Sequence, residues 1–124
     1  DIRIASADAV FGMPEAGLGM IPVAGGTQIL PRTLGIGKTM SLLLTHKNIS
    51  AQEAKDIGAV NEVVDRESLW SHVIKTAEQI SCNDELSLGT IKENLRAGLD
   101  RPLLEAIDSE YNTALNMIMS KTLY

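Results

Sequence analysis

The sequence contains a single cysteine, Cys82, so no disulfide can form within the chain and a metal cage built from several thiolates is excluded. Basic residues are also scarce. The 11 Lys and Arg stand against 16 Asp and Glu, which gives a formal net charge of −5 at pH 7. Non-specific binding to nucleic acid depends on clustered Lys and Arg, and the sequence has no basic run. The charge balance therefore argues against nucleic acid as a partner.

Long hydrophobic runs are absent as well. The longest apolar stretch lies around Met40–Leu44 and is far shorter than the roughly 20 residues that a helix needs to cross a bilayer. A charged-then-apolar leader is not visible before the first predicted strand. We therefore expect a soluble chain, and one cysteine is compatible with a reducing compartment.

The sequence lacks an initiator methionine. Its first residues, Asp1-Ile2-Arg3-Ile4-Ala5, already alternate polar and apolar side chains like a half-buried strand. A start inside a regular element predicts that the chain is a fragment of a longer protein.

The first half of the chain predicts a mixed α/β arrangement. Strands are expected over 1–6 and 9–12, and Gly and Pro are too dense over 13–26 for a regular element. Helices are expected over 27–34 and through Met40–Leu44. Ser50-Ala51-Gln52-Glu53 is a capping box that starts a helix ending at Gly58, and a strand follows over 59–64.

The second half predicts helices only. One begins at Asp65, a second at Asn83 or Asp84, and a third at Asp100 with Pro102 in its first turn. The last helix carries a broad, methionine-rich apolar stripe that calls for a partner. The change in composition after residue 64 predicts a boundary between two subdomains, 1–64 and 65–124.

The segment Phe11–Thr27 is the most informative part of the chain. It places one carboxylate, Glu15, behind a rigid proline and ahead of a glycine-rich loop that opens onto a helix. Such an arrangement suits an acid or base aimed into a pocket. A bare Pro-Glu pair is more often a solvent-exposed loop, and the Gly25-Gly26-Thr27 turn alone is more often structural than phosphate-binding.

Over half of its length, the sequence resembles the crotonase superfamily, which comprises the enoyl-coenzyme A hydratases and isomerases. The matching segments, in order along the chain, are Asp1-Ile2-Arg3-Ile4-Ala5-Ser6, Ala9-Val10-Phe11-Gly12, Pro14-Glu15, Leu18-Gly19, Ile21-Pro22, Gly25-Gly26-Thr27, Leu30-Pro31-Arg32, Gly35, Thr45, Ile49–Ala54, Gly58 and Val60–Val64. This resemblance implies an α/β fold: a remnant of the crotonase ββα spiral over 1–64, the second half of the α/β core, followed by an incomplete helical subdomain of the trimerisation type over 65–124.

The resemblance also implies the chemistry. Family members hold an acyl-CoA thioester and stabilise an enolate in an oxyanion hole made of two backbone N–H groups. Glu15 matches the second of the two catalytic glutamates of the hydratases, and Met13, Pro22 and Val23 take substrate-binding positions. The first glutamate and both oxyanion-hole loops would precede Asp1, so the fragment alone is expected to be inactive.

Two departures from the family pattern concern the site. Val23 stands where the family has a small or flexible residue, and its branched side chain disfavours positive φ, which favours isomerisation over hydration. His46 stands where glycine usually ends a helix, at a cost of about 1 kcal/mol if the left-handed cap is kept. His46 and His72 have no further ligand at a suitable spacing, so no metal site is expected.

The resemblance implies an intact protein that is a homotrimer or hexamer, works in the cytoplasm or in a mitochondrial or peroxisomal matrix, is not secreted, and needs no cofactor besides the coenzyme A of its substrate. Two other hypotheses remain open. One is a noncatalytic interaction or oligomerisation module, suggested by the methionine-rich last helix. The other is RNA binding, known for one branch of the family, against which the acidic balance counts.

Overall fold

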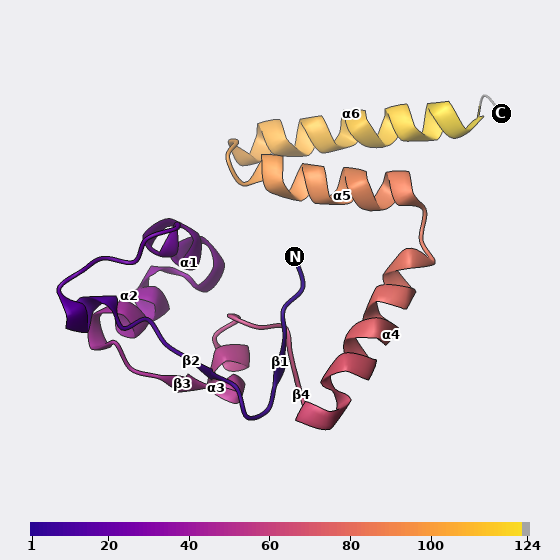
Figure 1. The fold of residues 1–124 in the computed structure, drawn as a ribbon. Coiled ribbons are helices and arrows are strands. Elements are labelled where there is room, and N and C mark those ends of the chain that lie inside the picture. Colours follow the sequence, from indigo (N-terminus) through magenta and orange to yellow (C-terminus); the bar gives the residue numbers. More distant parts are fainter. Residues whose placement is uncertain (123–124) are drawn as a thin grey trace. The chain divides into compact units, whose positions relative to one another are not determined.

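The structure, a computed structural model, describes residues 1–122. Contacts divide the chain into two compact units, Asp1–Thr76 and Ala77–Tyr124, and the boundary falls within helix α4 (Leu69–Ser81). The first unit mixes strands and helices, and the second is helical (Figure 1). This order of elements confirms the sequence prediction, whereas the subdomain boundary after residue 64 stays a prediction. Residues 123–124 of the predicted helical part lie outside the described residues.

Two short strand pairs organise the first unit. β1 (Ile4–Ser6) pairs in parallel with β4 (Glu62–Val64), and the two lie side by side in Figure 1. β2 (Val10–Phe11) pairs antiparallel with β3 (Ile49–Ser50). Arg3 and Asn61 fix the register of the parallel pair, because the Arg3 N–H donates to Asn61 Oδ1 at 2.8 Å and the Asn61 N–H donates to the Arg3 carbonyl at 2.8 Å.

Strand β4 is shorter than the sequence predicted. The expected strand began at residue 59, but the N–H groups of Ala59 and Val60 both donate to the Ala54 carbonyl, at 2.7 and 3.2 Å. These bonds cap the end of α3 (Ala51–Asp56), where Gly58 takes the expected left-handed conformation with φ 84°. The residues between the helix and β4 are therefore used to end the helix, and the ladder begins only at Glu62.

The core of the first unit is small and lies where α3 meets the strands. Its buried members are contributed by β1, α2 (Ile36–Thr45), β3, α3 and the segment before β4: Ala5, Leu42, Ile49, Ala51, Ala54 and Val60. Ala51 and Ala54 are fully buried, and their small side chains let α3 approach the strands closely. Phe11 and Met13 pack against the same cluster. The core thereby anchors the end of β2, from which the Glu15 segment departs.

The glycine-rich segment is more regular than the sequence predicted. Glu15–Leu18 forms a 3-10 turn, η1, and helix α1 (Gly26–Leu34) begins one residue earlier than expected. Pro14 explains the turn, because its φ of −80° and ψ of −3° already lie in the helical region. Gly19 then ends the turn in the left-handed conformation, with φ 71°. Glycine and proline here shape a tight turn.

The second unit is a pair of packed helices, α5 (Glu85–Gly98) and α6 (Leu103–Thr122), which run side by side in Figure 1. Of the two predicted caps, Asp84 is the one used, since its carboxylate accepts from the Ser87 N–H at 2.8 Å. The apolar stripe of α6 is exposed in this chain over Leu103, Leu104, Ile107, Tyr111, Leu115, Ile118 and Met119.

The predicted capping box gives the stability of the chain an expected pH dependence. The Ser50 backbone N–H donates to Glu53 Oε2 at 2.8 Å, and this bond, then the Ser50 hydroxyl, then Lys47, hold the pKa of Glu53 below its ordinary 4.5. The folded carboxyl thus binds its proton more weakly than the unfolded one. Its contribution to stability is complete above pH 4.5 and is lost as the pH falls through the lowered pKa.

Urea unfolding at several pH values checks this expectation. The urea concentration at the unfolding midpoint of the intact protein should decrease as the pH is lowered below 4.5. Glu53→Gln should remove part of that decrease. Wild-type and variant midpoints that change in parallel with pH would contradict it.

Candidate active site

Glu15 opens the 3-10 turn η1, and the local backbone holds it firmly. The Gly17 N–H donates to the Pro14 carbonyl at 3.0 Å, and the Met20 N–H donates to the Glu15 carbonyl at 2.9 Å. Pro14 itself adds a fixed φ immediately before the carboxylate. Glu15 is therefore held by the proline ring on one side and by the closed turn on the other.

The Glu15 carboxylate turns into the protein. Its Oε2 atom exposes less than 1 Å² and has no hydrogen-bond partner within residues 1–122. A buried oxygen without a partner is uncommon and costs free energy, because water is lost and nothing replaces it. An acceptor in this state is suited to meet a proton or donor brought by a bound molecule.

Met13 and Pro22, two residues expected to bind substrate, come together around Gly26. A Cβ atom added to Gly26 would lie 2.5 Å from the Pro22 Cβ and 3.1 Å from the Met13 Cε. Gly26 is thus needed for the close approach of the segment before Glu15 to the segment before α1. The role of Met13 and Pro22 toward a substrate stays a prediction.

Val23, the third expected substrate-binding residue, has a side chain that is 80% exposed in this chain. Within the described part of the chain, the non-glycine residues with positive φ are Ala24, at 56°, and His46, at 40°. Val23 therefore does not take the left-handed conformation. Ala24 takes it instead, and so does Gly25, with φ 89°. Ala24 was not among the predicted site residues, and the adjacent pair Gly25-Gly26 was the local signal for its conformation.

His46 has the left-handed cap conformation that the sequence analysis considered, with φ 40° and ψ 29° at the end of α2. Its imidazole lies against Gly17 of η1, the turn that carries Glu15. His72 lies elsewhere, where its Nε2 is 2.8 Å from Glu62 Oε2. Within residues 1–122, no three His, Cys, Asp or Glu side chains gather as metal ligands would.

None of the helices described here combines the length and the apolar character needed to cross a membrane.

Two comparisons with known proteins point to the same family. The family model described as enoyl-CoA hydratase/isomerase matches residues 1–122. A short-chain-enoyl-CoA hydratase from Clostridioides difficile is 44% identical over 112 residues, which cover 90% of this chain and 72% of that protein.

Two solved structures share the fold. An enoyl-CoA hydratase from Bacillus anthracis aligns with a TM-score of 0.92 at 38% identity, over 96% of this chain and 46% of that one. A putative enoyl-CoA hydratase from Thermobifida fusca, solved in complex with CoA, aligns with a TM-score of 0.92 at 27% identity, over 100% of this chain and 48% of that one. These likenesses confirm the expected crotonase-type α/β fold. The chain spans less than half the length of either structure.

Proposed function

Because the chain belongs to the enoyl-CoA hydratase/isomerase family of the crotonase superfamily, we propose that the intact protein acts on acyl-CoA thioesters and that Glu15 transfers a proton at the carbon next to the thioester. The observation that carries this proposal is the Glu15 Oε2 atom, which is buried in a turn fixed by Pro14 and has no hydrogen-bond partner among residues 1–122. A carboxylate in that state can exchange a proton with a substrate bound beside it.

The proposed chemistry is proton transfer through an enolate. When a base takes a proton from the α-carbon, the electron pair of the C–H bond moves toward the thioester and the carbonyl oxygen becomes negatively charged. Two backbone N–H groups of an oxyanion hole stabilise that charge, and they come from the length that the relatives have beyond this chain. In hydration, the first catalytic glutamate, outside this chain, takes a proton from water as the water oxygen bonds to the β-carbon, and Glu15 gives a proton to the α-carbon of the resulting enolate.

Double-bond isomerisation by the same residue is the alternative within the family. In that case Glu15 removes a proton from one carbon and returns it to another. Val23 is exposed and takes no positive φ, and the preference for isomerisation that its branched side chain suggested stays a prediction. Hydration of a 2-enoyl thioester and conversion of a 3-enoyl to a 2-enoyl thioester, measured side by side, distinguish the two reactions.

The proposed reaction needs no resident cofactor, because coenzyme A arrives as part of the substrate. The T. fusca relative solved with CoA supports this choice of substrate. Names of relatives from Dictyostelium discoideum and Pongo abelii include the word mitochondrial. We place the intact protein in the cytoplasm or in an organelle matrix.

We also propose that the intact protein is a homotrimer or hexamer. The support is the stripe of α6, whose exposed apolar residues recur every three or four positions and include Leu104, 80% exposed, and Ile118, 62% exposed. Surfaces of this kind are covered in stable proteins by other chains or segments. A noncatalytic interaction module would use the same surface but would not need the buried carboxylate oxygen of Glu15.

Catalysis by the chain on its own is expected to be absent. The purified 124-residue chain should not hydrate crotonyl-CoA, whereas the intact protein should, because the oxyanion hole and the first of the two catalytic glutamates are supplied by the remaining length. Measurable turnover by the purified chain would contradict this division of the site.

A further inference from the structure

His46 occupies a conformation that its side chain does not favour. It ends α2 with φ 40° and ψ 29°, in the left-handed region where a Cβ atom crowds the backbone. Glycine takes this conformation without strain, and the glycines that end η1 and α3 do so at φ 71° and 84°. The folded chain therefore tolerates a histidine at a position where glycine would be more stable.

The side chain that this position carries lies on the turn of Glu15. A Cβ atom added to Gly17 would lie 3.5 Å from Cγ and Cδ2 of His46 and 3.6 Å from its Cε1. Three ring atoms at nearly equal distances mean that the face of the imidazole is turned toward Gly17. Helix α2 and η1 are in contact as elements, and the ring of His46, the residue after α2, adds a side-chain contact beside theirs.

The outer side of the turn is exposed in this chain. Leu18 is 66% exposed, Met20 57% and Ile21 72%. In the described part of the chain, no side chain caps the start of η1, which rests on its own backbone hydrogen bonds and on Pro14. The His46 ring is thus a flat lateral support for a short turn whose first residue is Glu15.

We propose that His46 is a positioning residue for Glu15. The His46 ring contacts Gly17 and so holds η1, the turn that begins with Glu15, in place. The proposal rests on the proposed function, since turnover is what makes the position of Glu15 matter. Contact through the ring face requires a planar side chain and no particular hydrogen bond. Phenylalanine should therefore replace histidine here, and glycine should not.

The test compares His46→Gly, His46→Phe and Lys47→Gly in the intact protein. His46→Gly relieves the left-handed strain, so its Tm should equal or exceed that of the wild type. Its kcat for crotonyl-CoA should nevertheless fall about tenfold with KM unchanged, because a misplaced acid or base slows chemistry more than binding. His46→Phe should recover most of that loss. Lys47→Gly adds glycine to the same connection without removing the ring, and should keep the wild-type kcat.

Amide hydrogen exchange gives a readout that is independent of activity. Exchange at Gly17 and Met20, whose N–H groups close the turn, should accelerate in His46→Gly and stay at the wild-type rate in His46→Phe. A wild-type kcat in His46→Gly, or equal losses of kcat in His46→Gly and Lys47→Gly, overturns the proposal. An intact wild-type protein without thioester activity refutes the proposed function instead. In that case unchanged exchange in His46→Gly still overturns the support of the turn by the ring.

Discussion

Replacement of Glu15 by glutamine should lower kcat for an enoyl thioester by about 10²- to 10⁴-fold, the range that a positioned acid or base contributes. Glutamine keeps the size and shape of the side chain but neither takes up nor releases a proton. The fold should remain intact, because Oε2 makes no hydrogen bond within the described residues that the change would break. Steady-state kinetics with crotonyl-CoA and a thermal melt of the same sample measure both effects.

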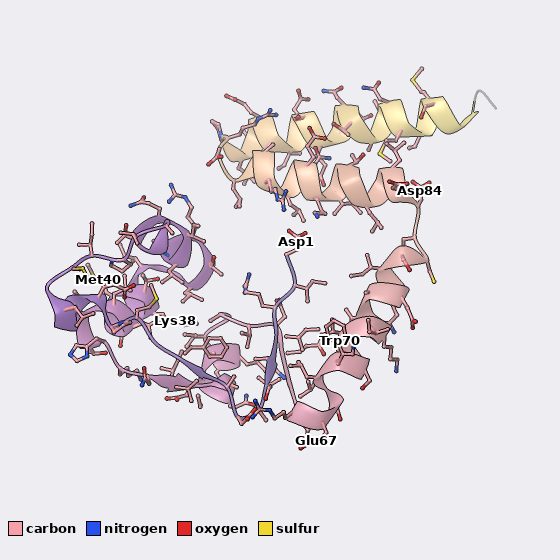
Figure 2. The ribbon with its side chains drawn as sticks, viewed as in Figure 1. Asp1, Lys38, Met40, Glu67, Trp70 and Asp84 are labelled. Atoms are coloured by element: carbon pink, nitrogen blue, oxygen red, sulfur yellow. The ribbon has the colours of Figure 1, made fainter. Side chains whose placement is uncertain are left out.

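Glu67→Gln is the matched control for this substitution. Glu67 is an exposed carboxylate of the short turn η2 (Arg66–Ser68) and is labelled in Figure 2. The same loss of charge there should leave kcat unchanged. Near-normal turnover by Glu15→Gln would remove Glu15 from the mechanism, and a large loss of Tm would show that the carboxylate has a structural role instead.

Gly26→Ala is expected to destabilise the intact protein by about 1–3 kcal/mol, the usual cost of overpacking. The added Cβ would lie 2.5 Å from the Pro22 Cβ, and a proline ring has no flexible end that could move aside. It would also press on the Met13 methyl, one residue before Pro14. The strain should therefore reach the turn of Glu15 and lower kcat as well as stability.

Gly37→Ala is the control for the glycine change. Gly37 lies inside α2, and a Cβ atom added there meets no atom of the described residues within 4 Å. Alanine favours a helix over glycine by about 1 kcal/mol, so this variant should be as stable as the wild type or more so. Urea unfolding of both variants gives the comparison. A Gly26→Ala protein as stable as Gly37→Ala would contradict the close approach of the two segments.

Local features of the fold were predictable because the residues involved are neighbours in the sequence. The capping box of Ser50 and Glu53 formed as expected, with both of its hydrogen bonds. Gly58 took the left-handed conformation that ends α3, and His46 took the one discussed for α2. In each case the residue types at fixed spacing already determine the bonds or the backbone conformation.

Other features depend on how the local elements compete. The sequence predicted an irregular segment before α1, but Pro14 is held in helical geometry and Glu15 starts a 3-10 turn. Residue 59 has the apolar character of a strand, yet its N–H is used to cap α3. Residue type alone does not decide between two hydrogen-bond partners that both lie within reach.

The arrangement of the site could be predicted only in part. The proline-glutamate pair singled out Glu15, but the burial of its Oε2 atom depends on surroundings that no local motif specifies. The contact between Gly17 and His46 joins residues from η1 and α2 and exists only once α2 has packed. Exposure of apolar side chains could not be predicted locally either. Met40 on α2, labelled in Figure 2, is 54% exposed, although its residue type is typical of a core.

Proton exchange at the thioester α-carbon tests the role of Glu15 most directly. The intact protein, incubated with 3-hydroxybutyryl-CoA or crotonyl-CoA in D₂O, should incorporate deuterium at the α-carbon, detectable by mass spectrometry. Glu15→Gln should incorporate it at least about 10²-fold more slowly, while Glu67→Gln should match the wild type. Wild-type deuterium incorporation by Glu15→Gln would contradict the account, because the α-proton would then be handled by another group.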